Sequence, residues 1–259
     1  VSGNVNAGEA ATVTAMASVT GDVGAGTATT VTANGNVTGS VTAGTDADVF
    51  TMGDICGSTL SAGTGDIDAM AFGDISSSMT AGADVIAFAE GNMTVPSVNV
   101  GGSVDLTALG ATTQLISVNA GGNVSVTAFG SLDAPAVIAG GDADLFAMGS
   151  TVVDVTSANA WIFSDDDVEA WVSASEDADV TSLGASLKTN MTAVGDAFAY
   201  TAGAITASII DAAGEAWLTA LTQLADSSVH GEQGAFAMAG SDMTLVDVIS
   251  ASGAASVIG

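Results

Sequence analysis

The chain has 259 residues, of which 48% are hydrophobic, 33 are glycine and only two are proline. Its formal net charge is −28, because Lys188 is the only Lys or Arg against 29 Asp and Glu. This charge excludes nucleic acid as a partner, since no cationic surface is present to neutralise phosphates. It argues equally against anionic membrane surfaces, and no run of about 18 apolar residues could span a bilayer. Cations are the partners that such a charge favours.

The sequence is dominated by an internal repeat that begins at the first residue and recurs every 18 to 20 residues. Repeats of this period are typical of solenoids, in which stacked units bury a common core. In chain order, the rows start at Val1, Val19, Val37, Ile55, Ile75, Met93, Thr113, Leu132, Thr151, Val168, Leu187, Ile205, Leu224 and Met243.

Two further columns of apolar residues recur in step with the row starts. The first comprises Val5, Val23, Val41, Leu60, Met79, Val98, Val118, Val137, Val155, Val172, Met191 and Ile209. The second comprises Val13, Val31, Val49, Ile67, Ile86, Leu106, Val126, Leu145, Ile162, Val180, Phe198, Trp217 and Phe236. Apolar and other residues alternate around both columns, which predicts two strands in each row with these residues facing inward. Glycines between the strands are expected to supply the turns.

The sequence therefore predicts an all-β fold, a single-stranded parallel β-solenoid of about 14 coils over residues 1–259, as one domain. With about 4.8 Å between paired strands, such a stack would be roughly 65 Å long. The pattern is more regular in residues 1–150 than in 151–259. The segments 169–175 and 215–224 have a helical alternative, but the preserved spacing favours continued coils.

Two rows, VNAGGNVSVTAFGS at 118–131 and VIAGGDADLFAMGS at 137–150, resemble the haemagglutinin-type repeats of large secreted adhesins. The resemblance implies a right-handed parallel β-helix and a secreted or surface-attached structural protein. It also implies an extracellular location, with any secretion signal removed before Val1. One departure is that adhesin passengers usually carry an N-terminal capping region, which this sequence lacks.

Because the repeat runs through both ends of the sequence, we expect uncapped end coils with unpaired strand edges. The residues expected there are Val1, Val5, Val13, Met243, Val257 and Ile258. The two end faces differ, so head-to-tail stacking would generate an open filament of identical chains. The alternative is that the sequence is a passenger or stalk segment of a secreted adhesin, with caps elsewhere.

Several acidic residues occupy the turn that follows an Ala-Gly pair, and one run of three lies at 165–167. Stacked carboxylates about 5 Å apart would repel one another, and Ca²⁺ prefers oxygen ligands of this kind. Calcium is therefore the predicted cofactor; the alternative is a solvated acidic surface. The candidate ligands are Asp46, Asp84, Asp142, Asp165, Asp166, Asp167, Asp177 and Asp196. A second acidic set, expected to point outward from the later strand of each row, is Asp48, Asp66, Asp105, Asp144 and Asp179.

Four N-x-S/T sequons predict glycosylation at Asn36, Asn92, Asn123 and Asn190, all expected near turns. No catalytic constellation is evident: His230 is the only histidine, is expected in a turn, and has no nucleophile at a recognisable spacing. The sequence thus predicts a structural protein rather than an enzyme.

Overall fold

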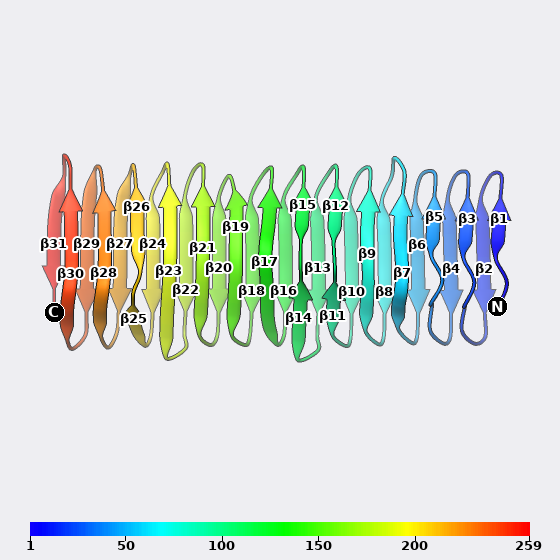
Figure 1. Cartoon of the computed structure of the whole chain (residues 1–259), viewed down its shortest axis with the longest axis horizontal. Coiled ribbons are helices and arrows are strands. Elements are labelled where there is room, and N and C mark those ends of the chain that lie inside the picture. The colour runs from blue at the N-terminus through cyan, green and yellow to red at the C-terminus, as the bar shows by residue number, and fades with distance from the viewer. The chain divides into compact units, whose positions relative to one another are not determined.

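A computed structural model describes the side chains of residues 1–57 and 59–259. It confirms the fold class: the described chain is all-β without a helix, and its parallel strands stack as a β-solenoid of about 13 turns. Two units are distinguished, Val1–Ala134 (unit 1) and Pro135–Gly259 (unit 2). In each unit the strands form two sheets, here sheet A and sheet B, and each coil contributes to both (Figure 1).

Within unit 1, sheet A contains β1 (Val5–Ala7), β3 (Val23–Ala25), β5 (Val41–Ala43), β7 (Ile55–Ala62), β9 (Ile75–Ala81), β11 (Met93–Val95), β12 (Val98–Val100), β14 (Thr112–Leu115) and β15 (Val118–Ala120). Its sheet B contains β2 (Ala11–Ala15), β4 (Thr29–Ala33), β6 (Ala47–Thr51), β8 (Ile67–Ala71), β10 (Val85–Ala89), β13 (Val104–Ala108) and β16 (Val124–Ala128). Strand β17 (Ser131–Ala139) contains the point at which the chain divides into its units.

Within unit 2, sheet A contains β19 (Thr151–Ser157), β21 (Val168–Ala174), β23 (Ser186–Ala193), β25 (Ala204–Thr206), β26 (Ile209–Ala212), β28 (Leu224–Gly231) and β30 (Met243–Ser250). Its sheet B contains β18 (Ala143–Ala147), β20 (Ala160–Ser164), β22 (Ala178–Ser182), β24 (Ala197–Thr201), β27 (Glu215–Ala220), β29 (Gly234–Ala239) and β31 (Ala254–Ile258). The segments with a helical alternative are strands β21 and β27, as the spacing predicted.

The core lies between the two sheets, because every second residue of a strand points inward. In β2 and β6 the inward residues are buried and the alternate ones exposed. The predicted row starts are confirmed: Ile55 pairs with Ile75, and Leu187 pairs with both Val168 and Ile205. Inward side chains are mostly Ala and Val on sheet B, so the sheets approach closely and coils of 18 to 20 residues suffice to fill the interior.

The second predicted inward column is wrong at several positions. Ile86, Phe198 and Trp217 point outward, with 52%, 37% and 39% of their surface exposed. Phe236 pairs with Trp217 and lies on the same outer face. In each case the next residue along the strand occupies the core instead; these residues are Ala87, Ala199, Leu218 and Ala237. Side chains alternate with a period of two, so an error of one residue moves a whole strand to the opposite face.

Two smaller corrections concern Ile67 and Ile209. Ile67 is buried but pairs with Ala47, two residues before the position that its column predicted. In sheet A, Ile209 is exposed and Ile210 takes its inward place opposite Met191. The shift at Ile209 follows a one-residue bulge, since residues 188–189 of β23 lie opposite three residues, 206–208.

This bulge recurs in the two following coils of unit 2. The extra residue has a left-handed backbone conformation in all three coils. It is Ala207, Asp226 or Leu245, with φ of 52°, 51° and 52°, respectively. This conformation costs a non-glycine residue about 1–2 kcal/mol. Its repetition indicates that each coil adopts the backbone path of the coil on which it stacks.

Candidate functional site

The predicted metal ligands Asp46 and Asp84 belong to a ladder of hydrogen bonds at one turn of unit 1. The main-chain N–H of Asp66 donates to Asp46 Oδ1 over 3.2 Å, and that of Asp84 donates to Asp66 Oδ1 over 2.8 Å. Asp84 Oδ1 in turn accepts the N–H of Ser103 at 2.7 Å, and Ser103 Oγ accepts the N–H of Asn123 at 3.2 Å. Each carboxylate therefore binds the backbone of the next coil. Asp66, predicted to point outward from a strand, is a member of this turn ladder instead.

A second ladder lies at the other turn of the same unit. Here Asn36 Oδ1 accepts the N–H of Asp54 at 3.1 Å, and Asp54 Oδ1 accepts that of Asp74 at 3.0 Å. The series continues through Asn92, whose N–H donates to Asp74 Oδ1 at 2.7 Å and whose Oδ1 accepts the N–H of Thr112 at 3.0 Å. The predicted sequon residues Asn36 and Asn92 are thus half-buried and engaged between coils.

Glycines precede many ladder residues because a side chain there would collide with the ladder. A Cβ at Gly65, Gly73 or Gly102 would overlap Oδ1 of Asp46, Asp54 or Asp84, respectively, on the preceding coil. Backbone conformation is not the cause, since among the described glycines only Gly57 has left-handed backbone, with φ of 67°. The glycines do lie in the turns between strands, as the sequence predicted. Close approach between coils is what requires them.

Unit 2 has an equivalent ladder that contains Asp177 and Asp196. Asn159 Oδ1 accepts the N–H of Asp177 at 3.0 Å, and Asp177 Oδ1 accepts that of Asp196 at 2.8 Å. Asp196 Oδ1 then accepts the N–H of Glu215 at 2.7 Å. The ladder begins beside Asp142, whose Oδ1 accepts a hydrogen bond from Asn159 Nδ2 at 2.8 Å.

The three consecutive carboxylates at 165–167 do not act as one group. Asp167 Oδ1 accepts the N–H of Ser186 at 2.8 Å, as a ladder residue does. Asp166 Oδ2 accepts a hydrogen bond from Ser150 Oγ at 3.2 Å, and Asp165 donates its N–H to the Ala147 carbonyl. Across the described residues, no three His, Cys, Asp or Glu side chains converge in a group that could hold a metal ion. Calcium binding stays a prediction.

The outer face of sheet B in unit 2 combines aromatic and acidic side chains in one column. Trp161 pairs with Asp179, and Asp179 pairs with Phe198, so three consecutive coils contribute one residue each. Asp179 Oδ1 accepts a hydrogen bond from Thr181 Oγ1 at 3.2 Å. Burial raises the pKa of Asp179 above its ordinary value, and the Thr181 hydrogen bond lowers it to a smaller extent. Asp48, Asp105 and Asp144 lie at the same position of other sheet B strands, as the sequence predicted.

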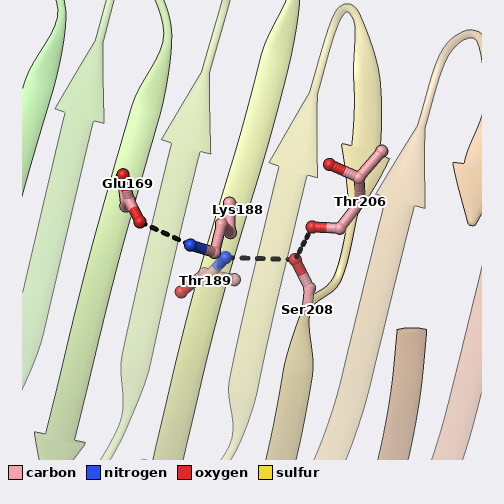
Figure 2. Close-up of polar contacts among 5 residues, drawn as sticks. All are labelled: Glu169, Lys188, Thr189, Thr206 and Ser208. Atoms are coloured by element: carbon pink, nitrogen blue, oxygen red, sulfur yellow. Dashed lines mark hydrogen bonds and ion pairs between the residues drawn. The ribbon is translucent and has the colours of Figure 1, made fainter. Parts of the chain in front are cut away.

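Lys188, the single Lys or Arg of the chain, lies on the outer face of sheet A in unit 2. Its Nζ donates to Glu169 Oε1 on the neighbouring strand β21 at 2.6 Å (Figure 2). The same Nζ lies 5.7 Å from the ring centroid of Trp171, within the range of a cation–π contact. Both side chains of the ion pair are largely exposed to water, so the pair contributes little to stability.

Behind Lys188, a series of inward hydroxyls runs along the bulge. The N–H of Thr189 donates to Ser208 Oγ at 3.0 Å, and Ser208 Oγ lies 3.4 Å from the Thr206 carbonyl to which it donates (Figure 2). The N–H of Ser208 donates to Ser227 Oγ at 3.3 Å, and Ser227 Oγ donates to the Ala225 carbonyl at 2.8 Å. These hydroxyls replace strand hydrogen bonds that the extra residue displaces, which gives them a structural role.

The remaining predicted sites have separate locations. Asn123 lies at the turn after Gly122, and Asn190 is exposed on strand β23 opposite Trp171. His230 lies in strand β28, not in a turn, and its Nδ1 is 3.0 Å from Asp211 Oδ1 on β26. Glycosylation at the four sequons and the absence of enzymatic activity both stay predictions.

Sequence and structure comparisons give no relative for this chain: no family model, curated protein or solved structure matches. No helix among the described residues is long and apolar enough to cross a membrane. The resemblance to haemagglutinin-type repeats therefore stays a prediction, and function must be argued from the coils themselves.

Proposed function

We propose that the chain is a structural subunit of an extracellular filament that extends by stacking of coil on coil. The observation that carries the proposal is the polarity of the ladders. A residue such as Asp84 accepts through its side chain from one neighbouring coil and donates its N–H to the other. A coil that contributes such a residue thus has a side-chain acceptor on one face and a complementary backbone donor on the opposite face. Such heterologous faces join head to tail without a limit on length.

The outermost described coils expose apolar side chains that point inward. Val257 in β31 is 54% exposed, whereas its partner one coil earlier, Ala237, is 2% exposed. At the other end Val1 is exposed and Val5 is half-buried, but Val13 is already covered. Met243 is half-buried and Ile258 is exposed, although Ile258 pairs with the outward Met238. The inward residues Val5, Met243 and Val257 would be covered by a further coil, from whichever polypeptide supplies it.

Electron microscopy and sedimentation of the purified chain across a range of concentrations test the proposal. We expect particles that lengthen with concentration, and we expect Val257→Lys to abolish lengthening because it places a charge on the inward face. Ile258→Lys is the matched control: it adds the same charge one residue later on the outer face and should leave assembly intact. Particles of one fixed length at every concentration would refute the filament and favour the stalk of an adhesin.

Cations, Ca²⁺ foremost, are proposed to support assembly by screening the ladder carboxylates. Only Oδ1 of Asp46, Asp84, Asp177 and Asp196 is used between coils, so the second oxygen of each is available to a cation. Thermal unfolding in Ca²⁺ and in chelator, at matched ionic strength, separates binding from general screening. A melting temperature that chelator leaves unchanged would remove calcium from the proposal without affecting the stacking experiment.

A further inference from the structure

The outer face of sheet B in unit 2 contains a depression of about 330 Å³ between the side chains of Trp161 and Phe198. This volume lies within the range of small-molecule sites, about 300–1,000 Å³. Asp179 lies between the two aromatic residues, on the coil that separates them. Further carboxylates border the depression, from Asp144, Asp177 and Asp196. The lining therefore combines two aromatic walls with an acidic rim.

The spacing of the aromatic walls follows from the coil register. Trp161 and Phe198 occupy the same position two coils apart, so their backbones are separated by about 9.6 Å, twice the strand spacing. Asp179 occupies the level midway between them, so a cation bound above its carboxylate would lie between the two aromatic side chains, at a spacing comparable with the roughly 6 Å within which a cation is attracted to an aromatic face.

Trp161 belongs to a cluster of nearly parallel aromatic rings on this face. Phe163, two residues along the same strand, stacks on Phe146 of the preceding coil with 5.4 Å between centroids and an interplanar angle of 2°. Trp161 lies 5.9 Å from Phe163 and is inclined to it by 16°. Asp179 pairs with Trp161 on the next coil, so the wall that adjoins this carboxylate is part of a stacked aromatic cluster.

We propose that this depression binds a quaternary ammonium group, held between Trp161 and Phe198 and neutralised by Asp179. Aromatic walls with a nearby carboxylate recognise such cations, whose charge is diffuse and whose hydration is weak. A metal ion fits less well, because no three acidic, His or Cys side chains in the described chain converge as ligands. The acidic rim also selects against ligands with an anion beside the ammonium group, so choline should be preferred to phosphocholine.

The environment of Asp179 is consistent with this assignment. Its carboxylate is half-buried beside aromatic carbon, and burial raises its pKa because the charged form is less well solvated. The one described hydrogen-bond partner of the carboxylate is the Thr181 hydroxyl. A cation in the depression would restore a favourable environment for the ionised carboxylate.

Isothermal titration with choline, at constant ionic strength in potassium chloride, tests the proposal. The neutral carbon isostere 3,3-dimethylbutan-1-ol has the same shape without the charge and should bind at least about tenfold more weakly. Phosphocholine should also bind more weakly than choline. Because phosphocholine contains the phosphate of a lipid headgroup, this comparison distinguishes binding of a free small cation from binding of a lipid headgroup. Equal binding of choline and its neutral isostere, or no choline binding to the wild-type chain, would overturn the proposal.

Two variants locate the site. Asp179→Asn keeps the shape of the side chain and removes its charge, and Phe198→Leu removes one aromatic wall; each should weaken choline binding by about three- to tenfold. Asp105→Asn is the matched control, because Asp105 has the same position in its coil but is paired with Ile86 and Ser125. An equal loss in Asp105→Asn would show general attraction to an acidic protein and would also overturn the site.

Discussion

The main-chain N–H of Asp196 donates to the carboxylate of Asp177, one coil earlier, over 2.8 Å. This contact reassigns the acidic turns: their side chains are acceptors for the backbone of the next coil. It also explains how a chain with a net charge of −28 can stack carboxylates at one turn. Each charge is partly compensated by an N–H dipole directed at it.

Removal of one ladder acceptor should destabilise unit 1 by about 1–3 kcal/mol, because a backbone N–H of the next coil loses its hydrogen-bond partner. Asp84→Ala removes the acceptor for the N–H of Ser103, whereas Asp84→Asn retains a side-chain oxygen at the same place. We therefore expect Asp84→Ala to be clearly less stable in urea unfolding and Asp84→Asn to lie close to wild type. Equal losses in the two variants would show that charge, not the acceptor, matters.

Replacement of a buried hydroxyl that lacks a partner should stabilise the protein. Thr113 Oγ1 is buried and has no hydrogen-bond partner among the described residues. Thr113→Val keeps the shape and removes the unsatisfied group, which should add about 1 kcal/mol to the free energy of unfolding. Thr29→Val is the control, since Thr29 Oγ1 donates to the Thr42 carbonyl at 2.9 Å and its removal should destabilise. If both variants lose stability, the reasoning from hydrogen bonding fails.

Glycine at the bulge should relieve backbone strain. Ala207 has φ of 52°, a conformation that costs alanine about 1–2 kcal/mol and glycine very little. Ala207→Gly should therefore raise the melting temperature. Ala202→Gly, five residues earlier and outside the left-handed region, should lower it by adding chain entropy to the unfolded state. A lower melting temperature for Ala207→Gly would contradict the assigned backbone.

Asp179 gives a pH dependence with a definite sign. Its pKa is raised in the folded protein above the ordinary value of 3.8, so its ionised form opposes folding. That opposition is complete above the folded pKa and disappears as the pH falls below 3.8. Asp179→Asn should consequently be more stable than wild type at neutral pH and lose this advantage in acid. Unfolding midpoints of Asp179→Asn and wild type, measured at neutral pH and below pH 3.8, check this prediction. A stability difference between the two proteins that does not change with pH would refute it.

The sequence predicted the coil register well where inward residues are large. Row starts such as Ile55, Ile75 and Leu187 are correct because β-branched and long aliphatic side chains fill the core there. It failed in some strands of sheet B, as in β24, where Ala199 points inward and Phe198 outward. Hydrophobicity alone assigns the larger residue to the core, but in strand β24 the register places the small Ala199 inward and Phe198 on the outer face.

The ladders were missed although the sequence contains their signal. Gly-Asp or Gly-Asn recurs immediately before a strand, as at Gly65-Asp66 and Gly91-Asn92. The spacing of one coil between such pairs would have placed each glycine over the carboxylate or amide of the previous coil. The carboxylates alone suggest a cation site, because stacked negative charges repel one another. The backbone N–H groups of the next coil, which the pattern of side chains does not reveal, are the donors that these carboxylates bind.

The bulge at Ala207, Asp226 and Leu245 has a consequence for how such a chain can change by duplication. A copied segment of one coil from residues 1–54 would meet matching donors and acceptors wherever it was inserted among its neighbours there. The same segment placed after residue 205 would lack the extra residue and would break the hydrogen bonds on both sides. Coils beyond the bulge are thus interchangeable only with one another, and a duplication there preserves the hydrogen bonds only if it copies a coil with the extra residue.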